Sequence, residues 1–246
     1  MVPPLSGVRL EFEPSDGSRT VTTLAEANPH EVASGRPVRS FASYVGMGHY
    51  PGWWWSATTG DHVAYESLLE RDRIMLADFD ACITHIAAQP FGITGILNGA
   101  ERRHVPDLLL RSSGDVLVVD VKPDRLLDKP EVAEVLEWTA TLMAERGWRY
   151  EVWSGAHATT LENLRFLAQG RRPLVDDAAM AALRRTGHAG DSLSTALVAA
   201  VASEPSLSLD DARAAMIRLL WLQEWQVDLA IPVNDDSRIT KTGAPA

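Results

Sequence analysis

Two short apolar runs on either side of a polar turn constrain the fold of this chain more than any other feature. The runs cover residues 105–111 and 116–121, and the Ser-Ser-Gly-Asp sequence at 112–115 separates them. Apolar runs of this length around a turn that contains glycine predict a β-hairpin. We therefore expect two antiparallel strands in the core of the fold.

Polar residues interrupt both runs near the open end of this hairpin. Symmetric pairing about the turn places Asp107 opposite Asp120, and Lys122 follows two residues later on the same strand. Residues two apart on a strand share one face of the sheet. Directly opposed side chains lie about 4.5–5.5 Å apart at Cβ, where like charges destabilise the pair. The sequence thus predicts two carboxylates and one lysine together.

Such a cluster has the chemistry of a hydrolytic metal site. Two carboxylates supply the oxygen ligands that a hard cation such as Mg²⁺ prefers. The cation polarises a phosphate and lowers the pKa of a bound water, while a lysine beside it stabilises developing negative charge. Taken singly, a Pro-Asp pair is typical of a turn and an Asp-x-Lys of a solvated strand edge. Their facing register favours the catalytic interpretation.

The segments around the hairpin alternate between helical and strand patterns. Apolar residues at helical spacing predict a helix over residues 61–80, with Glu66 and Glu70 on one face. Further patterns predict a strand over 81–86, a helix over 131–146 and a strand over 149–153. This order predicts an α/β fold in which a helix with carboxylates precedes the hairpin.

Composition shifts divide the chain into three segments. Residues 1–40 are polar and rich in Pro and Gly, and we expect mainly an irregular N-terminal arm, in which residues 8–13 and 20–24 could form short strands. The main domain is expected over 41–170, with a linker at 169–173. Residues 171–246 combine short helical patterns with a strand-like end, which predicts a smaller winged-helix-like domain.

Charge and cysteine content exclude several function classes. The formal net charge is −10, the wrong sign for a protein that grips DNA by bulk electrostatics alone. The chain has one cysteine, so an internal disulfide is impossible and a reducing, cytoplasmic setting is expected. No apolar stretch is long enough to span a membrane, and no signal-peptide pattern begins the chain. No zinc or phosphate-loop motif is found either.

A series of motifs resembles a known nuclease family. Ser67-Leu68-Leu69-Glu70-Arg71-Asp72, Gln89-Pro90, Pro106-Asp107 and Asp120-Val121-Lys122-Pro123 occur in the order and spacing of the TnsA endonuclease series. The resemblance spans roughly residues 40–155 and implies the αβββαβ core of restriction-endonuclease-like, PD-(D/E)XK nucleases. It implies Glu70, Asp107, Asp120 and Lys122 as catalytic residues, the three carboxylates as ligands of Mg²⁺ or Mn²⁺, and Gln89 and Glu66 as supporting residues. The family also has glutamine at the position of Asp120.

The same resemblance implies a function and partners. TnsA-like subunits cut the 5′ ends of a mobile element within a heteromeric transposase. The implied partners are transposon-end DNA, a TnsB-like transposase subunit and a TnsC-like ATPase regulator, which would supply the DNA affinity that the acidic chain lacks. Two alternatives stay open: a stand-alone restriction or repair nuclease, and a catalytically degenerate assembly module.

Overall fold

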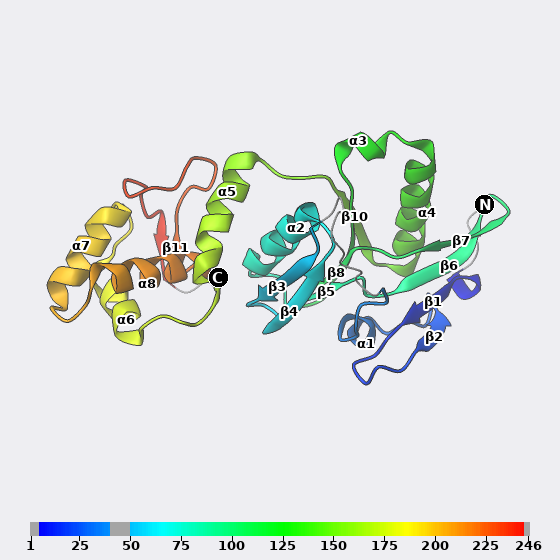
Figure 1. Ribbon diagram of the computed structural model, residues 1–246, viewed down its shortest axis with the longest axis horizontal. Coiled ribbons are helices and arrows are strands. Elements are labelled where there is room, and N and C mark those ends of the chain that lie inside the picture. Colours follow the sequence, from blue (N-terminus) through cyan, green and yellow to red (C-terminus); the bar gives the residue numbers. More distant parts are fainter. Residues whose placement is uncertain (1–4, 40–49, 244–246) are drawn as a thin grey trace. The chain divides into compact units, whose positions relative to one another are not determined.

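The computed structural model describes residues 5–39 and 50–243 of a mixed α/β chain (Figure 1). Its contacts divide the chain into two compact units, Met1–Gly155 and Ala156–Ala246. In the described residues, no helix is long and apolar enough to cross a membrane. The expected start of the main domain, at residue 41, lies outside the described residues.

The first unit contains most of the strands. Its elements are η1 (Leu5–Gly7), β1 (Arg9–Phe12), β2 (Thr20–Thr23), α1 (Pro29–Ala33), β3 (Gly52–Ser56), β4 (Asp61–Tyr65), α2 (Leu68–Phe79), β5 (His85–Ala88), β6 (Gly92–Leu97), β7 (Ala100–His104), β8 (Leu108–Arg111), β9 (Val116–Val121), α3 (Asp124–Leu127), α4 (Pro130–Arg146) and β10 (Arg149–Trp153).

Two four-stranded sheets position the predicted cluster. The central sheet has the order β10-β9-β8-β5, in which β9 and β10 are parallel and the other neighbours are antiparallel. The N-terminal sheet has the order β2-β1-β6-β7 and is antiparallel throughout. The predicted hairpin is β8–β9, and its register pairs Leu110 with Leu117 and Leu109 with Val118, as expected.

Helices cover both faces of the central sheet. One face contributes Leu109 and Val118 to a core shared with the N-terminal sheet and with Trp138 and Leu142 of α4. Side chains alternate along a strand, so Glu151 of β10 lies on the other face. There it pairs with Arg73 of α2 at 2.6 Å. The hairpin is therefore buried between α2 and α4, which accounts for its continuous apolar runs.

The helix expected over 61–80 is shorter than the sequence pattern indicates. Residues 61–65 form β4, which pairs with β3, and α2 begins only after Ser67. Gly60 has a φ of +68° in the turn between the two strands, a conformation that favours glycine. Ser67 accepts a hydrogen bond from the Glu70 N–H and caps the helix. Glu66 therefore lies before the helix, and the expectation that it shares a helix face with Glu70 is wrong.

The N-terminal segment is more ordered than an irregular arm. β1 pairs with β6, so residues near the N-terminus form an inner strand of the N-terminal sheet. Leu10 and Phe12 of β1 are buried in the shared core. Alternate apolar residues in β1 are the signal for this strand, and burial of one face stabilises it.

The second unit is mainly helical. It contains α5 (Ala158–Leu167), η2 (Ala168–Arg171), α6 (Asp177–Thr186), α7 (Leu193–Ser203), α8 (Leu209–Trp221), β11 (Trp225–Gln226) and β12 (Lys241–Thr242). β11 pairs with β12 in a short antiparallel ladder.

The segment expected as a linker is packed inside this second unit. Gly170 is buried against α8, where a Cβ atom would meet the Ile217 carbonyl oxygen at 2.7 Å. Arg218 donates hydrogen bonds to the carbonyls of Gly170 and Arg171. The division of the chain thus lies between 155 and 156, earlier than the 170/171 boundary that composition indicates.

Candidate active site

Asp107, Asp120 and Lys122 come together at one end of β8 and β9. Regular pairing of the hairpin extends to Leu108 and Val119 and ends there. The Asp107 N–H donates to the Val119 carbonyl rather than to Asp120. The regular ladder therefore ends before Asp107, and the predicted direct pairing of Asp107 with Asp120 does not form.

The Asp107 carboxylate makes two hydrogen bonds through one oxygen. Its Oδ2 accepts from the Val121 N–H at 2.7 Å and from Lys122 Nζ at 2.8 Å. The first bond takes the place of a ladder bond, because it satisfies a strand N–H with a side chain. Asp107 and Lys122 are thereby fixed to each other and to the end of β9.

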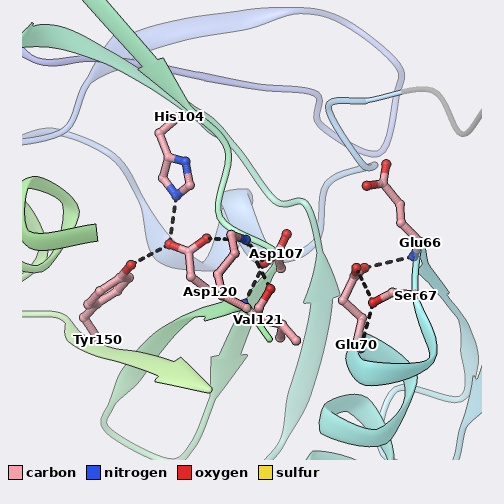
Figure 2. A network of polar contacts seen from close by, with 9 residues as sticks. Glu66, Ser67, Glu70, His104, Asp107, Asp120, Val121 and Tyr150 are labelled. Atoms are coloured by element: carbon pink, nitrogen blue, oxygen red, sulfur yellow. Dashed lines mark hydrogen bonds and ion pairs between the residues drawn. The ribbon is translucent and has the colours of Figure 1, made fainter. Parts of the chain in front are cut away.

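Asp120 is completely buried and is bound unevenly at its two oxygens. Its Oδ2 accepts from His104 Nε2 at 2.8 Å and from the Tyr150 hydroxyl at 2.5 Å (Figure 2). Its Oδ1 has no hydrogen-bond partner within the described residues and lies 3.6 Å from Lys122 Nζ. Unpaired buried oxygens are uncommon, because each loses its hydration without replacement.

Glu70 is buried at the first turn of α2, on the other side of the cluster from Asp120 (Figure 2). Its carboxylate accepts from the Glu66 N–H at 2.9 Å and from the Ser67 hydroxyl at 2.8 Å. Together with the Ser67 cap this makes a capping box, which stabilises the start of the helix. Glu70 therefore has a structural role whether or not it also binds a ligand.

Burial and repulsion raise the pKa values of two acids of this cluster, whereas hydrogen-bond donors and positive charge lower the pKa of the third. Burial raises the pKa of Glu70, and the Asp107 charge raises it further. Burial also raises the pKa of Asp107, and the opposing effect of Lys122 does not cancel the rise. For Asp120, burial is outweighed by His104, Lys122 and Tyr150, which hold the pKa of this carboxyl below its usual value.

Lys122 stays protonated despite its burial. Desolvation alone would lower its pKa, but the charges of Asp107 and Asp120 and the hydrogen bond to Asp107 raise it overall. An ammonium group donates hydrogen bonds and cannot accept a proton. Lys122 is thus suited to stabilise negative charge rather than to act as a base.

The two expected supporting residues, Glu66 and Gln89, make different contacts with the cluster. Glu66 contacts Glu70 through its backbone N–H. Gln89 is 2% exposed, and neither polar atom of its side chain has a hydrogen-bond partner in the described part of the chain. Its backbone N–H donates to the Asp107 carbonyl at 2.8 Å, and its φ of +45° is unusual for a residue other than glycine. Gln89 therefore binds the backbone of Asp107 while its own backbone has the unusual conformation.

The residues of the cluster fit a divalent cation by charge and by unmet bonding capacity. In the ranges 5–39 and 50–243, no three His, Cys, Asp or Glu side chains are placed to hold a metal ion together. The Lys122 ammonium lies at the two aspartates and supplies the positive charge there. Asp120 Oδ1, however, is buried without a hydrogen-bond partner among the described residues, and Asp107 and Glu70 are buried acids whose charges repel.

His104 and Tyr150 complete the site, and the sequence pattern did not indicate them. His104 is the last residue of strand β7. Tyr150 lies opposite Val118 in the parallel pairing of β10 with β9, and so faces the same side as Asp120. No local motif links these residues to Asp120, because they come from different strands. The alternation along β10 was the one available signal.

Of four arginines that lie near the candidate residues in the sequence, two are paired within the chain. Arg71 contacts Asp72 at 2.8 Å, and Arg73 contacts Glu151 at 2.6 Å. Arg102 and Arg103 are exposed on β7. Internal pairing of Arg71 and Arg73 reduces the positive charge that this surface offers to a phosphate backbone.

Comparison with protein-family models found no match, and comparison with curated proteins found none either.

Proposed function

We propose that this chain is a metal-dependent DNA endonuclease of the PD-(D/E)XK type, and that it serves as the TnsA-like subunit of a heteromeric transposase. The observation that carries the proposal is the cluster of Asp107, Asp120 and Lys122 beside the buried Glu70. Four charged groups in so small a buried volume oppose folding. A site that binds a cation and a phosphate accounts for them.

The order of elements around the cluster supports this proposal. α2, β5, β8, β9, α4 and β10 follow one another as helix, three antiparallel strands, helix and parallel strand. This order is compatible with the αβββαβ core of restriction-endonuclease-like nucleases, if the β6–β7 hairpin after β5 and the short α3 before α4 are insertions. The helices and short β11–β12 ladder of the second unit are compatible with a winged-helix-like domain.

Asp107, Asp120 and Glu70 are the residues that would hold Mg²⁺ or Mn²⁺. When bound, such an ion polarises the phosphate and lowers the pKa of a water molecule. Lys122 donates from Nζ to negative charge that develops on the phosphate oxygens. Gln89 fixes the backbone of Asp107 and so orients its carboxylate.

Partner subunits explain how an acidic chain acts on DNA. With a net charge of −10 and two flanking arginines paired internally, the isolated chain has little affinity for a phosphate backbone. We therefore propose that a TnsB-like transposase and a TnsC-like ATPase regulator bring it to transposon ends. Cleavage by the chain alone is expected to be weak and to rise when these partners are added.

A cleavage assay on transposon-end DNA tests the proposal. The protein is mixed with candidate TnsB-like transposase and TnsC-like ATPase subunits, in Mg²⁺, in Mn²⁺ or in a chelator. We expect 5′ strand cleavage that requires metal and is lost in Lys122→Met. Lys129→Met, which changes an exposed lysine at the start of α4, is the matched control and should cut normally. Cleavage in the chelator, or equal cleavage by Lys122→Met, would contradict the proposal.

A further inference from the structure

The two carboxylate oxygens of Asp120 have clearly different surroundings. Oδ2 accepts from both His104 and Tyr150, whereas Oδ1 is buried without a hydrogen-bond partner among the described residues. Rotation of an aspartate about its last side-chain bond is normally soft. Two bonds to one oxygen remove that freedom and determine which oxygen faces Lys122.

The two donors are themselves held by different parts of the first unit. Tyr150 is fixed by the parallel pairing of β10 with β9, and His104 by the pairing of β7 with β6, where it lies opposite Ile93. The central sheet supplies one donor and the N-terminal sheet supplies the other. Asp120 is thus held at the place where the two sheets meet, which explains why β7 runs toward the cluster.

The bond from Tyr150 has the length of a charge-assisted hydrogen bond. Its oxygen–oxygen distance of 2.5 Å falls in the range for a hydroxyl that donates to an ionised carboxylate. His104 Nε2 must also carry its hydrogen, because an ionised carboxylate can only accept. Both bonds therefore favour a charged Asp120, which is the form that binds a cation.

We infer that His104 and Tyr150 are positioning residues that hold Asp120 Oδ2 and leave Oδ1 alone to bind the divalent cation. The inference rests on the proposed function, since it concerns the same site. Donors that orient a metal-binding side chain typically change metal affinity or activity by about 10–100-fold when they are removed. Both residues act through Asp120, to which they donate hydrogen bonds.

Metal binding without DNA tests the inference separately from catalysis. Mn²⁺ affinity is measured by electron paramagnetic resonance on the full-length wild type and on Tyr150→Phe, His104→Leu and His104→Gln. We expect about 10-fold weaker binding or more in the first two variants. His104→Gln should recover much of the loss, because its amide nitrogen can donate near the position of Nε2. Tyr65→Phe, which alters a tyrosine on β4, is the matched control and should bind as wild type does.

The outcomes distinguish this inference from the proposed function. If the wild type binds Mn²⁺ and Asp107→Ala does not, but Tyr150→Phe and His104→Leu bind normally, the inference fails and the nuclease proposal stands. A purely structural role would lower the melting temperature and leave the Mn²⁺ affinity of the folded protein unchanged, which also overturns the inference. If the wild type binds no Mn²⁺, both fail.

Discussion

Asp78 and Asp120 are both buried carboxylates of the first unit, and their surroundings differ. Asp78, at the end of α2, accepts from the Trp54 indole at 2.9 Å and from the Ser56 hydroxyl at 2.7 Å. The N–H groups of Ala57 and Thr58 also donate to it. Four uncharged donors satisfy both oxygens, so Asp78 fastens the β3–β4 turn to the helix and has no spare capacity for a ligand.

Asp120 lies among charged groups, and one of its oxygens accepts no hydrogen bond from the described residues. Asp107 is close enough for each acid to disfavour the charge on the other, and Lys122 lies near both. Burial of charge without full pairing is costly, and such sites concentrate where proteins bind ligands. Burial alone therefore does not distinguish a structural acid from a functional one, whereas the balance of donors and charges does.

The largest effect that the comparison predicts concerns Glu70, which caps α2 as a structural acid and is also a proposed ligand of the metal ion. Glu70→Ala should reduce partner-stimulated cleavage by about 100-fold or more, the scale seen when a group that stabilises the reacting charge is removed. The fold should survive, because loss of the capping box costs about 1 kcal/mol and one repulsive charge disappears. Glu66→Ala should cut almost normally, since alanine retains the N–H that binds Glu70. A dead, folded Glu66→Ala beside an active Glu70→Ala would reverse the assignment.

The next effect separates the two buried aspartates by stability. Asp78→Ala should lower the free energy of unfolding by about 3 kcal/mol, because it leaves several buried donors without an acceptor. Asp107→Ala should stay within about 1 kcal/mol of the wild type, because the lost bonds are offset by relief of repulsion. Urea unfolding without metal measures both changes. Equal destabilisation by the two variants would remove the distinction that we draw.

The smallest effect is a dependence of stability on pH. The raised pKa values of Glu70 and Asp107 mean that the folded state keeps protons which the unfolded state has released. Stability of the metal-free protein should therefore fall as pH rises from the ordinary carboxyl range through these raised values. The lowered pKa of Asp120 acts at more acidic pH and in the opposite sense. Glu70→Gln should flatten the decline in urea midpoint, and an unchanged slope would show that Glu70 does not cause it.

The parts of the fold that depend on local patterns could be predicted from the sequence. The β8–β9 register and the position of α4 follow from apolar periodicity and from the turn between the strands. The same periodicity misplaced the start of α2. Residues 61–65 pair with β3, and the cap formed by Ser67 and Glu70 makes the helix begin only at Leu68. That cap was itself visible as Ser-x-x-Glu in the sequence.

Contacts between distant strands could not be predicted in this way. Asp107, Asp120 and Lys122 belong to one hairpin, so their proximity follows from local pairing. His104 and Tyr150 reach Asp120 only after β7 and β10 have joined their sheets. The pairing of β1 with β6 is likewise non-local, so the sequence pattern could suggest a short strand there but not its inner position in the sheet.

Thermal unfolding with and without metal tests the central claim, that the cluster around Asp107 and Asp120 is a divalent-cation site, most directly. A ligand that binds only the folded state stabilises it by about 2.7 kcal/mol at one hundred times its dissociation constant. We predict that Mn²⁺ or Mg²⁺ raises the melting temperature of the wild type and of Asp115→Ala, an exposed loop control, but not that of Asp107→Ala. No rise in the wild type at millimolar metal, or an equal rise in Asp107→Ala, would contradict the account.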